Sequence, residues 1–426
     1  MITFIIVSIS VLLLLGMPVA FAIGLGSAGA IIFFTKTPLL VVIQKMFAQL
    51  DSFPLLAVPF FILAGTLMDR GGISRKLIDF AMTLIGHIRG GLPMVSTLAG
   101  MFCASISGSA QASTAAIGSV LIPSMKEKGY HGGFCAAVMA TSGSIGVIIP
   151  PSIPMVIFAL TANVSIGRMF FGGYIPGLLI GLSLIGLSYL FALSHNYPTE
   201  CKATNTERLR AFRESFWAFG MAVIIMGGIL FGVFTATEAS VVAVVYAVIV
   251  GMFIYKNLRI VDIPEALIQS GIITGICMFC VATTAILGWL ITREQLPAKV
   301  AAAMLEITAN PAYILLMINV IYLFAGTILD TTPAILLLVP IFLPLVTSLG
   351  VDPTLFGVMT VINLAIGMCT PPVGVTLFVA CSLANEPISK VIKTLTPYIA
   401  VMVAVLMLIT YVPDIVLWIP DRLMPE

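Results

Sequence analysis

Residues 143–154 read GSIGVIIPPSIP, and residues 367–374 read GMCTPPVG. In both stretches a glycine precedes a Pro-Pro pair, and the two pairs lie 221 residues apart (371 − 150 = 221). Gly146 and Gly367 keep the same offset. Because proline removes a backbone donor and interrupts a helix, we expect one broken helix at the same place in each of two related halves.

The composition identifies the environment of the chain. Of its 426 residues 60% are hydrophobic and only 9% are charged, and the mean hydropathy is +1.16. Soluble proteins carry roughly 25% charged residues, so this chain is an integral membrane protein. The net charge of +2 is too small to indicate a nucleic-acid partner. Since a spanning helix needs about 20 apolar residues, the uncharged runs predict about ten to twelve spans in a lipid bilayer.

The repeat divides the chain into an N-terminal half, 1–194, and a C-terminal half, 216–426, joined by the polar stretch 195–215. In each half two short apolar arms flank a tip rich in small and hydroxyl residues, at about 92–125 and 311–350. Paired interrupted segments of this kind are typical of inverted-repeat transporters. We therefore expect an all-α polytopic membrane protein with two re-entrant helical hairpins.

The tips and the broken helices supply the chemistry of a candidate site. Unwound backbone at a tip or beside a Pro-Pro pair offers carbonyl oxygens, and the nearby hydroxyls add further hard ligands for a small cation. The N-termini of the second hairpin arms present N–H groups to an anion. Close packing of small residues is the alternative explanation, but it does not account for adjacent prolines in both halves.

Charged residues inside apolar runs are few. Asp330 is the only charge in 311–351, and it can cap a helix, bind a ligand or do both. Glu238 is expected to be a helix cap. Because no Lys or Arg is placed near either tip by the sequence, the charge of an anionic cargo would be balanced by helix dipoles and co-bound cations. The three histidines lie at edges or in loops, so sodium is favoured over proton coupling.

The cargo is predicted from the same polar groups. The substrate-binding residues are expected to be Ser107, Ser109, Ser152, Asp330 and Thr331. A small dicarboxylate has nothing to donate to an ionised Asp330, whereas a hydroxylated monocarboxylate such as a sugar acid has donors for it. We therefore expect a polyhydroxylated carboxylate, for example sialic acid, rather than a C4-dicarboxylate.

Seven stretches together resemble the large membrane subunit of tripartite ATP-independent periplasmic (TRAP) transporters. They are LLLLGMPVAFAIG (12–24), FFILAGTLMDRGG (60–72), SGSAQAS (107–113), GSIGVIIPPSIP (143–154), GVFTATEAS (232–240), GTILDTTPAILLLVPIFLP (326–344) and GMCTPPVG (367–374). The resemblance implies a sodium-driven, elevator-type transporter of the bacterial inner membrane, not an enzyme. It also implies two partners, a small four-helix membrane subunit and a periplasmic substrate-binding protein.

The resemblance further implies at least two Na⁺ sites. Their residues would be Ser105, Ser107, Gly143, Gly146, Ile149 and Pro150 in the first half, and Gly326, Gly367, Cys369 and Thr370 in the second. The main alternative is a stand-alone sodium- or proton-coupled anion symporter that needs no binding protein. An intramembrane protease would need paired intramembrane aspartates, or a serine with a buried histidine, whereas the sequence offers one interior aspartate and no histidine expected to be buried. A passive anion channel would show no coupling.

Overall fold

The computed structural model describes residues 1–195, 197, 199 and 202–424, and within them the regular secondary structure is helical. The all-α membrane class predicted from the sequence is confirmed. In the first half the helices are α1 (Ile2–Leu14), α2 (Val19–Phe34), α3 (Leu40–Leu50), η1 (Phe53–Leu56), α4 (Ala57–Arg70), α5 (Ile73–Ile85), α6 (Gly91–Ser107), α7 (Ala110–Glu127), α8 (Gly132–Ser144), η2 (Ile145–Val147), α9 (Ile153–Ala162) and α10 (Ile166–Ser194).

The second half follows a similar order. Its helices are α11 (Asn205–Leu230), α12 (Ala236–Ile249), η3 (Val250–Ile254), η4 (Ile260–Asp262), α13 (Ile263–Arg293), α14 (Leu296–Ile307), α15 (Pro311–Ile328), α16 (Thr331–Ser348), α17 (Pro353–Met368), α18 (Val375–Ala384), α19 (Ile388–Tyr411) and α20 (Asp414–Leu423). The run from α4 to α10 thus recurs as the run from α13 to α19. The division into domains at 195–215 stays a prediction.

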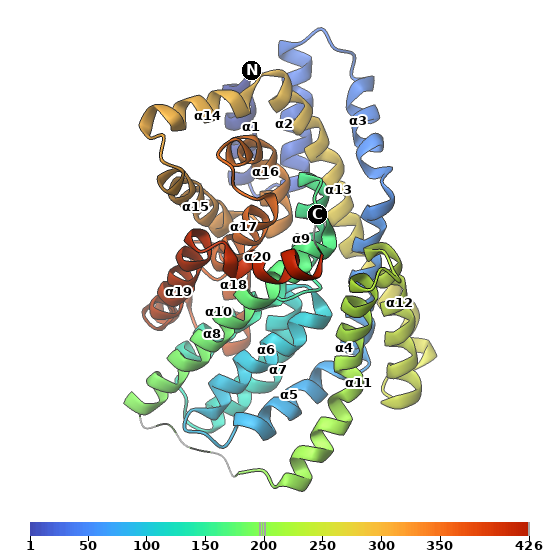
Figure 1. The fold of residues 1–426 in the computed structure, drawn as a ribbon, viewed down its shortest axis with the longest axis vertical. Helices are drawn as coiled ribbons and strands as arrows, with labels where there is room; N and C mark the ends of the chain where they lie inside the picture. The colour runs from blue at the N-terminus through green and yellow to red at the C-terminus, as the bar shows by residue number, and fades with distance from the viewer. Residues whose placement is uncertain (196, 198, 200–201, 425–426) are drawn as a thin grey trace.

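Eight helices of the described residues are long and apolar enough to cross a membrane. That is fewer than the ten to twelve spans predicted, because several apolar helices are short. In particular, α8 and α9 follow one another through a break, and so do α17 and α18. Figure 1 shows α3, α4, α11 and α12 along one side of the molecule, with α14, α15 and α19 along the other.

The hairpin tips are set by helix capping. Between α6 and α7 the chain turns at Gly108, which has a positive φ of 58°, and the hydroxyl of Ser109 then accepts a hydrogen bond from the backbone N–H of Ala112. Between α15 and α16 the carboxylate of Asp330 accepts the N–H of Thr331. Ser109 and Asp330 are 221 residues apart, so equivalent helices begin with different caps.

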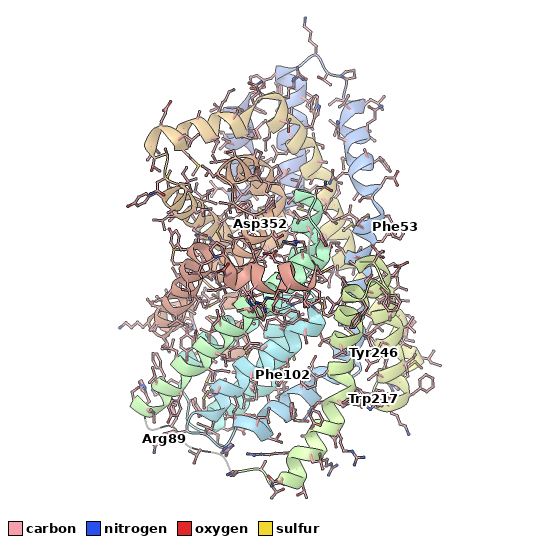
Figure 2. The ribbon with its side chains drawn as sticks, in the orientation of Figure 1. Phe53, Arg89, Phe102, Trp217, Tyr246 and Asp352 are labelled. Atoms are coloured by element: carbon pink, nitrogen blue, oxygen red, sulfur yellow. The ribbon has the colours of Figure 1, made fainter. Side chains whose placement is uncertain are left out.

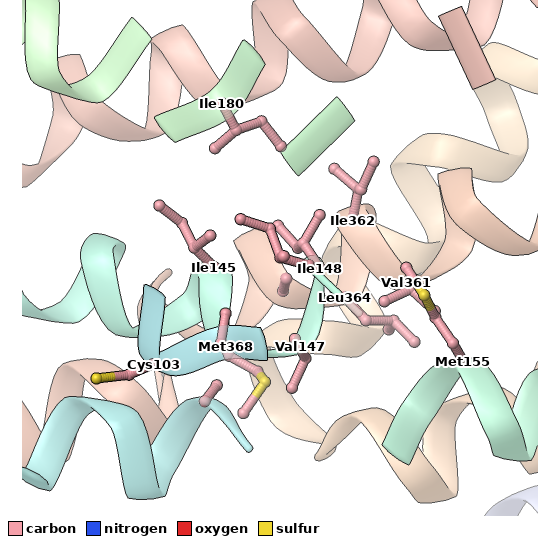
Figure 3. Packing of buried hydrophobic residues seen from close by; sticks show 14 of the residues in the cluster. Cys103, Ile145, Val147, Ile148, Met155, Ile180, Val361, Ile362, Leu364 and Met368 are labelled. Carbon is pink, nitrogen blue, oxygen red and sulfur yellow. The ribbon is translucent and has the colours of Figure 1, made fainter. Parts of the chain in front are cut away.

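Both broken helices carry a cis Pro-Pro bond, at Pro150–Pro151 and at Pro371–Pro372. Around the first break Ile145, Ile148 and Met155 are buried among apolar side chains of α17. Figure 3 shows these side chains gathered with Val361, Ile362 and Leu364. Part of the hydrophobic core therefore lies where the two broken helices meet.

The polar stretch 195–215 is not a loop along its whole length. Helix α11 begins at Asn205, behind a capping box in which Thr204 and Glu207 satisfy each other's backbone N–H groups. Residues 196, 198, 200 and 201 of this stretch lie outside the described residues. Glu238 forms a second capping box with Thr235, as expected from the sequence.

The short amphipathic helix α5 is braced by aromatic rings. The ring of Phe80 lies 6.0 Å from that of Phe102 on α6 and 5.9 Å from that of Phe219 on α11. Phe102 and Phe219 also contact each other edge to face at 5.0 Å. Figure 2 shows Phe102 in the lower half of the molecule, among these helices. The ring cluster thus ties α5 to one arm of the first hairpin and to α11.

The two halves differ where α10 and α19 begin. Arg168 in the first turn of α10 donates hydrogen bonds to Asp421 (2.7 Å) and to the Met424 carbonyl (2.8 Å), and it lies 3.9 Å from Asp352. Figure 2 labels Asp352 in the middle of the molecule. The equivalent residue in α19, Lys390, makes only a 3.4 Å ion pair with Glu386, and its side chain is 70% exposed. One half is therefore fastened to α20 by a buried cation.

Candidate functional site

A cavity of about 570 Å³ lies between two walls that are formed by different sets of helices. One wall, here called the scaffold wall, is formed by α4 and α13. The other, here called the tip wall, is formed by the two hairpin tips together with the broken helices. The scaffold wall contributes Ile62, Gly65, Thr66, Asp69, Arg70, Gln269, Ile273, Ile276 and Cys277. The tip wall contributes Ser107–Ala112, Val147, Ile153, Pro154, Asp330, Thr331, Thr332 and Met368.

Helical periodicity explains the scaffold wall. The α4 residues from Ile62 to Arg70 recur at three- and four-residue steps, and so do the α13 residues from Gln269 to Cys277, so each set lies on one face of its helix. Each helix packs against several other scaffold helices, α4 on α12 and α13, and α13 on α2 and α3. The polar groups on this wall are therefore held by long, well-packed helices.

A side-chain hydrogen bond between described residues joins the two tips. The Gln111 amide donates to one oxygen of the Asp330 carboxylate at 3.2 Å, while the other oxygen accepts the Thr331 N–H at 2.7 Å. Asp330 is thus a helix cap and a cavity-lining residue at once. Gln111 comes from the first turn of α7, so the bond crosses from the first hairpin to the second.

Behind the first tip several oxygens converge on Gly146. The Ser107 hydroxyl pairs with the Ser113 hydroxyl at 2.8 Å and points to the Ser109 carbonyl at 3.4 Å. A Cβ added to Gly146 would lie 2.8 Å from the Ser113 Oγ and 3.0 Å from that same carbonyl. Only glycine allows the broken helix to approach this tip so closely.

Behind the second tip two backbones touch. A Cβ added to Gly367 would lie 2.5 Å from the Gly326 Cα and carbonyl carbon, and 2.9 Å from the Gly326 carbonyl oxygen. The next carbonyl, that of Thr327, accepts N–H groups from Val373 and Gly374 at 3.3 Å. The Thr370 hydroxyl donates to the Ile366 carbonyl at 2.7 Å. The second hairpin is thus held against the Pro-Pro break by backbone contacts.

The other residues that the sequence predicted for the site lie below the cavity surface. Ser105 donates to the Phe102 carbonyl at 2.7 Å, and Cys369 lies 3.1 Å from the Ile366 carbonyl. A Cβ on Gly143 would meet Thr114, and Ile149 and Pro150 are buried at the break. Ser152 is also buried, where it caps α9 and donates to the Val147 carbonyl at 2.6 Å. Of the five predicted substrate residues, Ser107, Ser109, Asp330 and Thr331 line the cavity and Ser152 does not.

Sequence reasoning missed the charged end of the scaffold wall. Arg70 lines the same cavity as both tips, contrary to the expectation that no basic residue lies near them. Its guanidinium donates to Glu265 at 2.9 Å and to Gln269 at 3.2 Å, and the neighbouring Asp69 accepts the Ser74 hydroxyl. The stretch DRGG (69–72) ends the motif FFILAGTLMDRGG (60–72), but nothing local in the sequence places it opposite the tips.

The polar groups of the cavity are suited to binding rather than to bond-breaking chemistry. They comprise hydroxyls, two amides, two carboxylates and one guanidinium, together with backbone oxygens behind each tip. The family model described as "Tripartite ATP-independent periplasmic transporter, DctM component" matches residues 6–415. The chain belongs to this family. It is a large permease subunit of the TRAP transporters, which are transporters and not enzymes.

Individual relatives agree with this assignment. The permease is 42% identical to the isethionate TRAP transporter permease protein DctMQ of Oleidesulfovibrio alaskensis over 95% of this chain, and spans 64% of the length of that protein. It is 38% identical to the C4-dicarboxylate TRAP transporter large permease protein DctM of Pseudomonas aeruginosa, covering 94% of both chains. The sialic acid TRAP transporter large permease protein SiaM of Vibrio cholerae is 37% identical, with 96% of both chains covered.

A solved structure shares the fold. The YdaH transporter of Alcanivorax borkumensis, described as having an unusual topology, superposes with a TM-score of 0.64 over 89% of this chain and 88% of that one. The sequence identity is 13%, so this likeness concerns the fold alone. Together with the apolar helices, the family establishes the permease as a multi-pass membrane protein.

Proposed function

We propose that this permease couples the entry of Na⁺ to the uptake of a small organic acid that a periplasmic binding protein delivers. The observation that carries the proposal is the pair of tips. Two equivalent helices, α7 and α16, begin at the same cavity, and behind each tip a glycine of a broken helix meets oxygens of the hairpin. Hard oxygen ligands suit Na⁺, and the helix N-termini suit an anion.

Each proposed Na⁺ site is formed by residues of one half of the chain. At the first, carbonyls and hydroxyls of Ser105–Ser109 would join the backbone of Gly143–Pro150, with the Ser113 hydroxyl as a further ligand. At the second, carbonyls around Gly326 would join Gly367, Cys369 and Thr370. Both Na⁺ ions are cargo in this scheme, and their binding would draw the hairpins towards the breaks.

The acid would lie in the cavity between the walls. Relatives named for isethionate, C4-dicarboxylates and sialic acid all carry anions, and a hydroxylated carboxylate such as sialic acid suits Ser107, Ser109 and Thr331. In an elevator mechanism the tip wall would move past α4 and α13 together with the acid and the ions. The two walls are formed by different sets of helices, and this supports such a movement.

Two partners complete the proposed transporter in the bacterial inner membrane. The family description names a tripartite periplasmic system, which would supply a small four-helix membrane subunit and a substrate-binding protein. Helix α3 has no buried residue among those described and is a candidate for contact with that subunit or with lipid. The alternative remains a stand-alone sodium- or proton-coupled anion symporter.

Reconstitution separates these possibilities. Permease, small subunit and binding protein are placed in proteoliposomes, and uptake of labelled succinate, isethionate and N-acetylneuraminate is measured with and without an inward Na⁺ gradient. We expect concentrative uptake of one acid that requires both the gradient and the binding protein. Uptake without the binding protein would favour the stand-alone symporter, uptake that follows a proton gradient would exclude sodium coupling, and downhill flux alone would indicate a channel.

A further inference from the structure

The charged side chains that line the cavity differ in their hydrogen-bond partners. Among the described lining residues, Asp69, Arg70 and Asp330 carry charge. Asp69 accepts the Ser74 hydroxyl, and Asp330 accepts N–H groups from Thr331 and Gln111. Both carboxylates are therefore hydrogen-bonded within the protein. Arg70 is the cationic group in this set, and of its two partners Gln269 lines the cavity whereas Glu265 does not.

The ion pair of Arg70 is easily exchanged. The side chain of Glu265 is 72% exposed and that of Arg70 only 25%, so the carboxylate stands largely in solvent. An exposed pair of this kind contributes about 0–1 kcal/mol. A guanidinium presents several N–H donors in a planar fork, of which Glu265 and Gln269 engage one on each Nη atom. A carboxylate or sulfonate entering the cavity can therefore displace Glu265 or bind beside it.

We propose that Arg70 binds the anionic headgroup of the cargo, exchanging Glu265 for the acid, while the hydroxyls of the tip wall bind the rest of the molecule. This assignment rests on the proposed function. It gives the acid one contact on the scaffold wall and several on the tip wall, so the acid bridges the two walls in this conformation. Movement of the tips away from α4 then separates the headgroup from Arg70.

The charge balance indicates what kind of acid fits. Two carboxylates and one guanidinium leave the cavity with one negative charge, and two Na⁺ ions would turn this into one positive charge. A single anionic headgroup cancels it, whereas a second carboxylate would remain uncompensated in a partly desolvated site. The inference is therefore that the cargo is a monoanion, a carboxylate or a sulfonate, rather than a dicarboxylate.

The permease contains its own reporter and its own control. Cys277 lines the cavity and is partly exposed, whereas Cys103, Cys135 and Cys369 are buried. Arg293 occupies the position in α13 equivalent to Arg70 in α4, at an offset of 223 residues, but it contacts Thr37 and the Trp289 ring instead of the cavity. Loss of Arg293 therefore removes a charge of the same kind without touching the proposed binding group.

The test follows the rate at which a methanethiosulfonate reagent modifies Cys277, read by peptide mass spectrometry on permease with its small subunit in nanodiscs containing Na⁺. Isethionate, N-acetylneuraminate and succinate are the probes. We expect one of the two monoanions to slow the wild-type reaction. Arg70→Gln should need roughly ten- to hundredfold more acid for the same protection, as expected for a lost charged hydrogen bond, while Arg293→Gln should behave as wild type.

Glu265→Gln distinguishes binding from bracing. If Arg70 binds the headgroup, removing its competitor lowers the acid concentration needed for protection, opposite in sign to Arg70→Gln. If the pair only joins α4 to α13, both variants change in the same direction, and the inference fails. Equal protection of wild type and Arg70→Gln also overturns it while leaving the transport proposal intact. Absence of protection by any of the three acids in the wild type would overturn the proposed function itself.

Discussion

At the first tip α7 begins with the neutral cap Ser109, whereas at the second tip α16 begins with the charged cap Asp330. Behind the first tip, the hydroxyl of Ser113, which is paired with that of Ser107, faces Gly146, while behind the second the backbones of Gly326 and Gly367 touch directly. The two halves thus share a backbone arrangement, but side-chain hydroxyls lie behind the tip in the first half and a backbone-to-backbone contact lies there in the second. Equivalent substitutions in the two halves should therefore have unequal effects.

The largest difference should come from adding a methyl group to the broken-helix glycines. Gly367→Ala would place its Cβ 2.5 Å from the Gly326 backbone, which cannot move aside, whereas Gly146→Ala first meets the Ser113 hydroxyl, which can rotate. Overpacking of this kind costs typically 1–3 kcal/mol. We expect Gly367→Ala to abolish Na⁺-driven uptake and Gly146→Ala to reduce it strongly.

Gly186→Ala is the matched control, because a Cβ at this α10 position meets no atom within 4 Å. Uptake is normalised to protein that elutes as a single peak in size-exclusion chromatography, so that misfolded material is not counted. If both Gly146→Ala and Gly367→Ala transport like Gly186→Ala, close backbone approach is not required at either break.

The next difference concerns the fastening of α20. Arg168→Met should lower the free energy of unfolding by about 2 kcal/mol, because it leaves Asp421 and the Met424 carbonyl without their charged donor. Lys390→Met at the equivalent place should change stability by less than about 0.5 kcal/mol, since the Lys390 side chain is 70% exposed. Thermal melts of both variants in the same detergent provide the comparison, and equal melting temperatures would show that the buried cation does not fasten α20.

A smaller effect is expected at the caps. Asp330→Asn keeps an oxygen for the Thr331 N–H but loses the charge, so we expect about a tenfold loss of apparent affinity for a hydroxylated acid, with folding preserved. Ser109→Ala should cost about 1 kcal/mol of stability through loss of the cap, with less effect on affinity. Uptake with competing acids measures the apparent affinity of both variants, and a thermal melt measures the stability of Ser109→Ala. Unchanged affinity in Asp330→Asn would mean that Asp330 acts as a cap alone.

The smallest effects should be those of single hydroxyls. Ser107→Ala removes a bond that joins two segments of the first tip, whereas the Thr370 hydroxyl bonds only within its own helix region. We expect the Na⁺ concentration for half-maximal uptake to rise roughly two- to tenfold in Ser107→Ala and less in Thr370→Ala. Thr396→Ala, whose hydroxyl makes a similar bond to Ile392 on an exposed face of α19, is the control. No change in Ser107→Ala would exclude its hydroxyl as an ion ligand.

The sequence predicted the features that repeat along the chain. Glycine and proline positions at the same or nearly the same offset indicated two halves, two broken helices and two tips, because breakers act through local backbone physics. The composition identified the membrane class, because a chain with so few charged residues is typical of a protein in lipid. Ser109 and Asp330 could be recognised as candidate caps, since a cap needs only the residues that follow it.

Contacts between distant segments could not be predicted in this way. Gln111 and Asp330 are 219 residues apart, and their bond depends on how the two hairpins pack. Arg70 reaches the cavity because α4 packs beside α13, which no local pattern encodes. The charges of the polar stretch 195–215 predict a linker, yet its second part forms the first turns of α11, because an exposed helix can have the same charged composition as a linker.

The length of α13 has a consequence for the surrounding lipid. Its 31 residues extend about 46 Å at 1.5 Å per residue, whereas the hydrocarbon core of a bilayer is about 30 Å thick. The helix must therefore tilt, project into the headgroups or thicken the bilayer around it, each at a modest free-energy cost per ångström of mismatch. Since α13 forms part of the cavity wall, acyl-chain length becomes a physical variable of transport, and vesicles of graded thickness should tune its rate.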